Sequence, residues 1–377
     1  MTGRTEALTP PLRGPGFGSY APDEVTWLLK DLSDVALEGD LRERERRIQS
    51  GQAHYAESLP IEYQPGTEYQ RLFHDTLRSS ARRLAEAVGV VAELILAERH
   101  SSPTLVSLAR AGTPVGILIR RWMETMHGIA PRHYTISIVR DRGIDTVALD
   151  HIVDRHPAES IVFVDGWTGK GAIQRELTAA LTEYARLPDR PRLADELAVL
   201  ADPGSCTTLY GTRDDFLIAS ACLNSTVSGL VSRTVLNADH IGPGEFHGAK
   251  CYRHLAGFDV SGELLDTVSA EFSVVADRVR AALAAMTPAS RTPTWAGWRS
   301  VEQIRLEYGL SSVNLVKPGV GETTRVLLRR VPWRVLVRAD DLPEHRHIRL
   351  LAAERDVPVE VSPGLAYSCV GLIKEDA

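Results

Sequence analysis

The chain has 377 residues, of which 44% are hydrophobic and 24% are charged. This length allows two or three domains, and the composition excludes a disordered, collagen-like or disulfide-stapled chain. The net charge of -6 argues against a nucleic-acid binder as a whole, but it is uneven, since residues 291–377 carry +2 and the preceding residues carry -8.

The N-terminal part is predicted to be mainly helical. Residues 1–17 are rich in Gly and Pro, lack the apolar core of a secretion signal and are expected to be flexible. The spacing of apolar residues predicts helices over Glu24–Leu37 and Tyr69–Glu98. No apolar run is long enough to span a bilayer, and the four cysteines form no CxxC pair. A cytoplasmic protein without a membrane partner or a zinc site is therefore expected.

From Leu105 onward, short apolar runs alternate with polar or Gly-rich turns and helical segments. This alternation is typical of βαβ units and predicts an α/β fold with a mainly parallel sheet flanked by helices. Ligands bind such sheets beyond the carboxyl ends of the strands, where these turns lie. The predicted strands are Leu105–Leu108, Thr135–Val139, Ile161–Val164 and Phe216–Cys222, and the turns after them are Ala109–Gly112, Arg140–Asp145, Asp165–Gly171 and Asn224–Gly229.

A second, smaller α/β unit is predicted at the C-terminus. A last helix over Asp277–Met286 ends the first domain, residues 18–286, and Thr287–Gly297 contains two prolines and reads as a linker. The second domain then covers residues 298–377. Its predicted elements are a helix over Thr323–Arg330, a strand over Arg334–Val337, a helix over Glu344–Arg355 and a strand over Val357–Val361.

The turn after Ile161–Val164 is the strongest candidate for chemistry. Asp165 ends the strand, and a Gly-rich turn leads into a helix that begins near Ala172. Exposed backbone N–H groups and the helix dipole at such a turn suit a phosphate, although a tight turn without a ligand would have the same pattern. The residues expected to hold the phosphate are Thr168, Gly169, Lys170 and Gly171.

Three of these turns together resemble the type I phosphoribosyltransferases. Asp165–Gly171 resembles the loop that holds the 5′-phosphate of phosphoribosyl pyrophosphate, although Gly166 replaces its second acidic residue. Leu105–Gly116 resembles the pyrophosphate loop, and Ile136–Asp145 resembles the start of the flexible catalytic loop. The resemblance narrows to the phosphoribosyltransferase-like proteins of bacterial tellurium-resistance and stress operons, the StiP-like family, through the segments Gly18–Tyr20, His54–Pro60, Leu223–Gly229 and Ser232–Thr234.

This resemblance implies a phosphoribosyltransferase with Mg²⁺ as cofactor. The enzyme would form or cleave an N-glycosidic bond to an unidentified base, with phosphoribosyl pyrophosphate or a nucleotide as partner and with a homodimer as the common assembly. Catalysis would rest on Arg110, Arg140, Arg142 and Asp165, and Asp165 would reach Mg²⁺ indirectly through pyrophosphate. The substrate-binding residues would be Ala111, Gly112, Thr168, Gly169, Lys170, Gly171, Asn224, Ser225, Thr226, Ser228, His54, Tyr55 and Glu57.

The C-terminal unit resembles the pelota-type RNA-binding domains, which are relatives of ribosomal proteins that bind kinked RNA. The resemblance is carried by Gly319–Arg325, which opens a helix, and by the strand and loop of Val357–Gly371. It implies binding of structured RNA, although the chain has Gly where the family usually has Asn. The implied RNA-binding residues are Gly321, Glu322, Thr323 and Arg325.

Two other functions stay open from the residues. Because the second acidic residue after Asp165 is missing, a non-catalytic, nucleotide-sensing RNA regulator is an alternative. A cysteine protease is a further one, with Cys222 paired to His247 or His54. Cys222 is expected in an apolar strand, where a thiol is normally inert, so this alternative ranks last.

Overall fold

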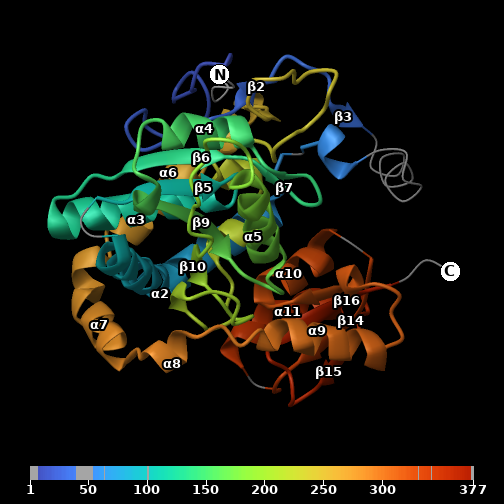
Figure 1. Cartoon of the computed structure of the whole chain (residues 1–377). Helices are drawn as coiled ribbons and strands as arrows, with labels where there is room; N and C mark the ends of the chain where they lie inside the picture. The colour runs from blue at the N-terminus through green and yellow to red at the C-terminus, as the bar shows by residue number, and fades with distance from the viewer. Residues whose placement is uncertain are drawn as a thin grey trace.

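The computed structural model describes residues 7–39, 54–62, 64–99, 102–329, 331–340 and 342–374. These residues form a larger N-terminal α/β domain and a smaller C-terminal α/β domain that packs against it (Figure 1). In this part of the chain, none of the helices combines the length and apolar character needed to cross a membrane.

The N-terminal domain is built on a six-stranded sheet whose neighbouring strands all run parallel, which confirms the predicted α/β sheet. The strand order is β1-β6-β5-β9-β10-β11. Because all strands point the same way, their carboxyl ends form one edge, and the turns that follow them meet there. The strands are β1 (Thr26–Trp27), β5 (Thr104–Leu108), β6 (Arg132–Ile136), β9 (Ile161–Trp167), β10 (Leu197–Ala201) and β11 (Leu209–Thr212).

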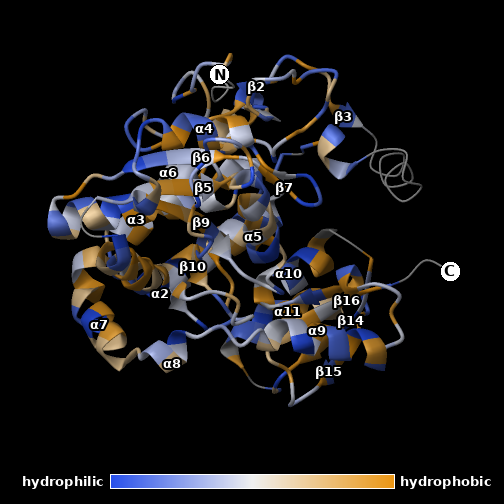
Figure 2. Cartoon of the chain, in the orientation of Figure 1, coloured by the Kyte–Doolittle hydropathy of each residue, from blue (hydrophilic) through white to orange (hydrophobic). Residues whose placement is uncertain are grey.

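Helices cover both faces of this sheet. Val162 and Val164 of β9 belong to an apolar cluster with α2, α3, α6 and α7, whereas Ile161 and Phe163 belong to a second cluster with α4 and α5. This alternation explains why the strand reads as an uninterrupted apolar run. Figure 2 shows hydrophobic and hydrophilic residues on different sides of outer helices such as α7. The helices are α2 (Thr67–Arg99), α3 (Gly112–His127), α4 (Thr146–Val153), α5 (Ala172–Tyr184), α6 (Ser261–Ser269) and α7 (Phe272–Ala285).

Short strands of the N-terminal domain also pair into separate two-stranded sheets. They are β2 (Lys30–Asp31) with β12 (Gly248–Ala249), β3 (Glu38–Gly39) with β4 (Leu59–Pro60), and β7 (Ile138–Val139) with β8 (Gly143–Ile144).

The C-terminal domain has a four-stranded mixed sheet in the order β13-β16-β14-β15. α9 packs on one face, and α10 and α11 pack on the other. The apolar cluster on the α10 side is continuous with a core cluster of the first domain, so the two domains share buried surface. The elements are α8 (Pro288–Arg291), which lies in the predicted linker, α9 (Ala296–Glu307), β13 (Val316–Pro318), α10 (Val320–Arg329), β14 (Pro332–Val337), α11 (Arg346–Ala353), β15 (Val359–Val361) and β16 (Cys369–Ile373).

The helix predicted over Glu24–Leu37 is wrong, because this segment forms β1 and β2. Trp27 and Leu28 are both fully buried but belong to different apolar clusters, as consecutive residues of a strand do. The described residues 7–17, in the part expected to be flexible, are held against this strand: Leu12 exchanges backbone hydrogen bonds with Trp27, and Phe17 packs edge-on to its ring.

The strand predicted over Phe216–Cys222 is also wrong, since Ala219–Cys222 forms the short 3-10 helix η3. This helix packs between α2 and α10 and pairs with no strand. Its apolar side chains are therefore buried between helices of two domains, a contact that leaves no period-2 pattern in the sequence.

Candidate functional site

The turns after β5, β9 and β10 lie together at the carboxyl edge of the sheet. The turn after β5 leads into α3 so closely that a Cβ atom on Gly112 would overlap the backbone oxygen of Val164. Arg110 lies in this turn, between Ala111 and the end of β5, and its guanidinium donates to the backbone oxygen of Val231 at 3.2 Å. Arg110 is also near Tyr252, since its charge lowers the pKa of that phenol while burial raises it more strongly.

Asp165 lies near the end of β9, at the centre of this edge. The backbone N–H of Gly166 donates to its carboxylate at 2.8 Å. Burial raises the pKa of Asp165 to about 7, and the Gly166 hydrogen bond opposes this only partly. No ion pair to Asp165 occurs within the described ranges. Asp165 is therefore a carboxyl group that changes charge near neutral pH.

The predicted catalytic loop lies against the segment of His54, Tyr55 and Glu57. The backbone N–H of Arg140 donates to the Tyr55 hydroxyl at 2.7 Å, and the Arg142 guanidinium lies 3.6 Å from the Glu57 carboxylate. His54 caps the short helix η1 (Tyr55–Glu57) by accepting the N–H of Ala56. The structure thus brings together two sequence-distant groups of predicted residues, whose role in binding stays a prediction.

The predicted turn at Asn224 is largely closed. Ser225, Thr226 and Ser228 are buried, and the Glu62 carboxylate accepts hydrogen bonds from the Ser225 N–H at 2.9 Å and from its hydroxyl at 2.8 Å. These contacts order the turn from within the first domain. The part of these residues in substrate binding stays a prediction.

The Thr168–Gly171 turn faces the C-terminal domain. The Lys170 ammonium donates to the backbone oxygen of Val313 at 2.5 Å, and the Tyr367 hydroxyl donates to the backbone oxygen of Gly169 at 3.1 Å. Burial and, to a smaller extent, the nearby charges of Lys317 and Arg140 lower the pKa of Lys170 to about 8. The predicted phosphate loop is therefore engaged by the second domain, which sequence reasoning did not foresee.

A hydrogen-bonded array joins this turn to the end of β10. The Thr168 hydroxyl donates to Asp202, and a hydrogen bond between the Thr168 side chain and Cys206 lowers the pKa of that thiol. Asp202 also pairs with Arg213 at 2.6 Å and accepts the Cys206 N–H. Burial dominates and raises the pKa of Cys206 to about 12, so the resting group is a thiol.

Cys206 differs from the other cysteines in its surroundings. Cys222, Cys251 and Cys369 belong to the largest apolar cluster, whereas Cys206 lies among polar side chains at the edge of the sheet. The start of α5 is beside it: a Cβ atom on Gly171, whose φ of 72° suits glycine, would lie 2.8 Å from its sulfur. Sequence reasoning missed Cys206, although Asp-Pro-Gly-Ser-Cys directly follows the apolar run Leu197–Ala201.

The predicted cysteine-protease pair is not assembled. Cys222 is fully buried in η3, and the His247 ring bonds to the Ser137 hydroxyl at 2.9 Å. Burial lowers the pKa of His247. His54 is used in the η1 cap.

The predicted RNA-binding residues lie at the start of α10, against the first domain. Thr323 is fully buried, and a Cβ atom on Gly321 would lie 2.7 Å from the Trp167 ring. Glu322 lies 3.5 Å from Arg325, whose guanidinium also donates to the backbone oxygen of Ala221 at 3.3 Å. Glu322 and Arg325 are half-buried and are the members of this set with side chains that reach solvent.

Asp215 links the two domains at the start of α10. Its carboxylate accepts the N–H of Val320 at 2.9 Å, at the first turn of α10, and the N–H of Ser368 at 2.8 Å. Burial raises the pKa of Asp215 to about 6, and these two hydrogen bonds oppose the shift. A first-domain carboxylate thus supplies the N-terminal cap of α10.

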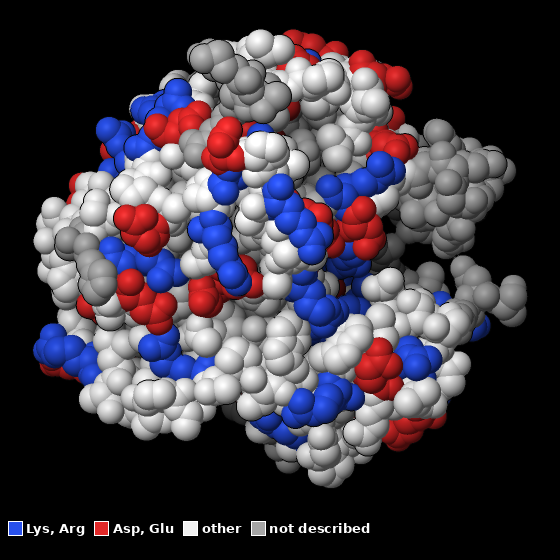
Figure 3. Space-filling model, viewed as in Figure 1, with Lys and Arg blue, Asp and Glu red and all other residues white. Residues whose placement is uncertain are grey.

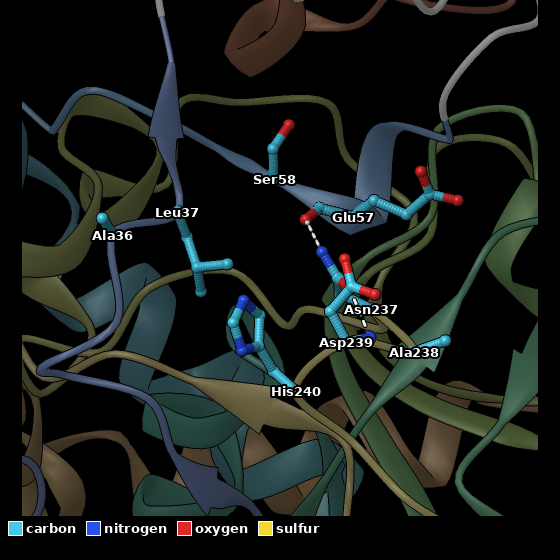
Figure 4. Close-up of a pocket in the computed structure, with 8 residues that line it drawn as sticks. All are labelled: Ala36, Leu37, Glu57, Ser58, Asn237, Ala238, Asp239 and His240. Atoms are coloured by element: carbon cyan, nitrogen blue, oxygen red, sulfur yellow. Dashed lines mark hydrogen bonds between the residues drawn. The ribbon is translucent and has the colours of Figure 1, made fainter.

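A pocket of about 430 Å³ lies beside the site, between Leu37, Glu57 and His240. Figure 4 shows the Glu57 carboxyl group pointing away from Leu37 and His240, and its backbone oxygen accepting a hydrogen bond from Asn237. Glu57 is the one predicted site residue in the lining, so we place the chemistry at the sheet edge instead. The lining residues are Ala36, Leu37, Glu57, Ser58, Asn237, Ala238, Asp239 and His240.

The residues at this edge do not form a resident Mg²⁺ site. Asp165 offers one carboxylate, and Asp202 is already bonded to Arg213 and to backbone N–H groups. Within the described ranges, no group of three or more His, Cys, Asp or Glu side chains is arranged to hold a metal ion. Mg²⁺ prefers several oxygen ligands, which this pair of carboxylates does not offer.

Comparison with known proteins matches both domains to families. A family model described as "Tellurite-like stress resistance cysteine protease StiP" matches residues 18–269, and one described as "PELOTA RNA binding domain" matches residues 295–375. The chain is 37% identical over 365 residues to a protein from Acinetobacter baylyi named "Cysteine protease StiP", with 92% of this chain and 91% of the relative covered. No solved structure matches. The C-terminal unit is thus a pelota domain, as predicted.

The expectation of a phosphoribosyltransferase is wrong, because both the family model and the relative are named cysteine proteases. Phosphoribosyl pyrophosphate is accordingly not supported as a partner. The geometry gives a physical reason for the error. The Thr168 hydroxyl donates to Asp202, Gly169 accepts from Tyr367 and Lys170 donates to the second domain, so the loop that resembled a phosphate site makes contacts within the protein.

Proposed function

Because the chain belongs to the StiP family of tellurite-like stress-resistance cysteine proteases, we propose that its N-terminal domain is a thiol-dependent peptidase with Cys206 as the nucleophile. The observation that carries this assignment is the array of Cys206, Thr168 and Asp202. Of the four thiols, Cys206 is the one that lies outside the apolar clusters. Its side chain is linked through Thr168 to the Asp202 carboxylate.

The array gives the thiol proton a path. As the sulfur attacks a peptide carbonyl carbon, the thiol proton passes to the Thr168 oxygen and the Thr168 proton passes to the Asp202 carboxylate. Burial raises the pKa of Asp202, which favours its acceptance of a proton. The carbon–nitrogen bond then breaks, the amine leaves with that proton, and water hydrolyses the thioester to a carboxylic acid and the free thiol.

The surroundings of Cys206 favour negative charge on sulfur once a substrate is present. Arg175 and Arg213 both lower the pKa of the thiol, and the start of α5 presents the positive end of its helix dipole nearby. These effects oppose burial, which dominates in the closed state. The nucleophile is therefore expected to act after the site has opened.

Access to Cys206 is controlled by the interdomain linker. The thiol is 2% exposed, and Trp295 lies over the same Gly171 surface that borders the sulfur. The Trp295 N–H donates to the backbone oxygen of Ser205 at 2.8 Å, and the Gly297 N–H donates to Gly204 at 3.1 Å. A peptide must displace this segment to reach the sulfur.

The test is cleavage of fluorescein-labelled casein by the full chain and by Trp295→Ala, each with and without Cys206→Ser. We expect Cys206→Ser to lower the cleavage rate by about a thousandfold or more, because the covalent step is lost. Cys222→Ser, which changes a thiol in the apolar core, is the matched control and keeps the activity. Equal cleavage with and without Cys206, or no cleavage in either background, contradicts the assignment.

We further propose that the pelota domain binds structured RNA. Its family supports this, and the second turn of α10 offers Arg325 as a cation. The test of this proposal is to measure, by fluorescence anisotropy at several salt concentrations, how tightly the full chain binds a bulged RNA hairpin. Arg325→Ala is expected to weaken binding about tenfold and to lower the salt dependence. A full chain that does not bind the hairpin overturns the proposal.

A further inference from the structure

Four cations from separate segments gather where the two domains meet. We call Arg140, Lys170, Arg175 and Lys317 the junction cations. The Arg175 guanidinium donates to the backbone oxygen of Lys170 at 3.3 Å, and a Cβ atom on Gly169 would lie 3.7 Å from Pro318, the neighbour of Lys317. The charges of Lys317, Arg140 and Arg175 all lower the pKa of Lys170, whereas Glu322 raises it. Figure 3 shows Lys and Arg side chains on both sides of the junction between the larger and the smaller domain.

The placement of these cations is fixed by both domains. Lys170 belongs to the turn before α5, yet its ammonium donates to Val313 of the second domain. Lys317 lies in β13, directly before α10. Like charges held close together repel one another, so their clustering is favoured only when an anion is near. The junction cations thus bring positive charge from both domains to one place.

Aromatic side chains border the same surface. The Arg175 guanidinium lies 4.0 Å from the centre of the Trp298 ring and 5.6 Å from that of Trp295. Trp298 is half-buried, so part of its ring reaches solvent. Cations interleaved with partly exposed aromatic rings suit a single-stranded or unstacked nucleic acid, whose phosphates and bases they can bind in turn.

We propose that the RNA-binding surface is shared by both domains, and that RNA bound to the pelota domain continues across the junction onto Arg175 and Arg140 of the first domain. This inference rests on the proposed RNA binding. The partner is RNA with an unpaired segment rather than a uniform duplex, because the aromatic rings need accessible bases. The negative first domain would therefore contact RNA at one basic strip, although its net charge argues against nucleic acid.

Helix α5 offers a matched pair of variants for the test. Arg175 lies in its first turn at the junction, and Arg186 lies just beyond its last residue, at the opposite edge of the sheet, where it pairs with Glu183. We measure binding of the bulged RNA hairpin by the full chain carrying Arg175→Gln, Arg140→Gln, Lys317→Gln or Arg186→Gln. Circular dichroism confirms that each variant is folded.

Each of the three junction variants is expected to bind about fivefold more weakly, and the slope of log affinity against log salt is expected to fall by about one per lost contact. Arg186→Gln keeps the affinity of the unchanged chain. If the chain binds the hairpin and Arg175→Gln behaves like Arg186→Gln, the shared surface is overturned while RNA binding by the pelota domain stands. Equal affinity for a DNA duplex of the same sequence also overturns it, because it indicates attraction to any polyanion.

Discussion

Asp165 and Asp202 lie at the ends of adjacent strands, yet their surroundings differ. Asp202 is fully buried and is bonded to Thr168, to Arg213 and to the N–H groups of Cys206 and Thr207. Asp165 accepts the N–H of Gly166, and no cation pairs with it in the described part of the chain. One carboxylate is thus part of a fixed network, whereas the other is held by a single backbone group.

This difference indicates that the two carboxylates at one sheet edge have different roles. Burial raises the pKa of both carboxyl groups, but several hydrogen bonds and the Arg213 charge oppose the shift at Asp202. A network of this kind orders the turn that carries Cys206. A carboxyl group with one partner keeps its capacity to bind or to exchange a proton. We therefore expect changes at Asp202 to affect folding as well as the proposed transfer of the Cys206 proton, and changes at Asp165 to affect how stability responds to pH.

Asp202→Asn is expected to have the largest effect. It leaves Arg213 without its buried partner and removes an acceptor of Thr168, so the free energy of unfolding is expected to fall by about 3 kcal/mol. Urea unfolding measures this change. Asp214→Asn, which removes an exposed ion pair to Arg83, is the matched control and shifts the free energy by about 0.5 kcal/mol or less. An equal change in the free energy of unfolding in the two variants would contradict the structural role of the Asp202 network.

Asp215→Ala tests the contact between the domains. The change leaves the N–H groups of Val320 and Ser368 without their acceptor, so docking of the second domain is expected to weaken by about 2 kcal/mol. Limited proteolysis within residues 287–297 measures this as faster cleavage. Asp214→Ala, at the neighbouring exposed position, is the control. Unchanged cleavage in Asp215→Ala would show that other contacts hold the domains together.

Trp295→Ala tests whether the linker covers the thiol. We expect Cys206 to be alkylated by iodoacetamide about tenfold faster, which corresponds to 1.4 kcal/mol of lost protection. Mass spectrometry of the digested protein reads each cysteine separately, so the core residue Cys222 is an internal reference. Trp298→Ala removes the ring that stacks on Arg175 and is expected to leave the rate unchanged. An unchanged rate at Cys206 in Trp295→Ala contradicts the proposed cover.

Asp165→Asn is expected to change how stability depends on pH. The pKa of Asp165 is raised to about 7 in the folded chain, so the folded state binds more protons than the unfolded state below that pH. The contribution of protonated Asp165 to the free energy of unfolding is therefore present in acid and is lost as pH rises toward 7. Relative to the unchanged chain, the free energy of unfolding of Asp165→Asn should rise by about 2 to 3 kcal/mol between about pH 5 and pH 8 in urea unfolding. A parallel pH dependence in both proteins contradicts the shift.

Much of the fold could be predicted because its patterns are local. The amphipathic helix expected over Tyr69–Glu98 is α2, and the apolar runs at Leu105–Leu108 and Ile161–Val164 are β5 and part of β9. The predicted helix over Glu24–Leu37 failed because Val25–Leu29 is buried on two sides, and a short run of this kind has no periodicity that separates strand from helix.

The candidate site was harder to predict, because it depends on contacts between distant segments. Arg140 and Tyr55 could be named from their turns, and the structure places them side by side. Cys206 was missed, since β10 and its turn were not recognised and nothing near Cys206 in the sequence identifies Thr168 as its partner. The linker residue Trp295 reaches that site only because the two domains pack together.

The most direct test of the account is covalent labelling of the full chain with a peptidyl acyloxymethyl ketone, followed by mass spectrometry of the digested protein. This reagent modifies a cysteine that is positioned to attack a peptide carbonyl. We predict one adduct, at Cys206, and its loss in Thr168→Val, in which the hydroxyl that links the thiol to Asp202 is absent. An adduct at Cys222, Cys251 or Cys369 instead, or no adduct either in the full chain or in Trp295→Ala, would contradict the assignment of the nucleophile.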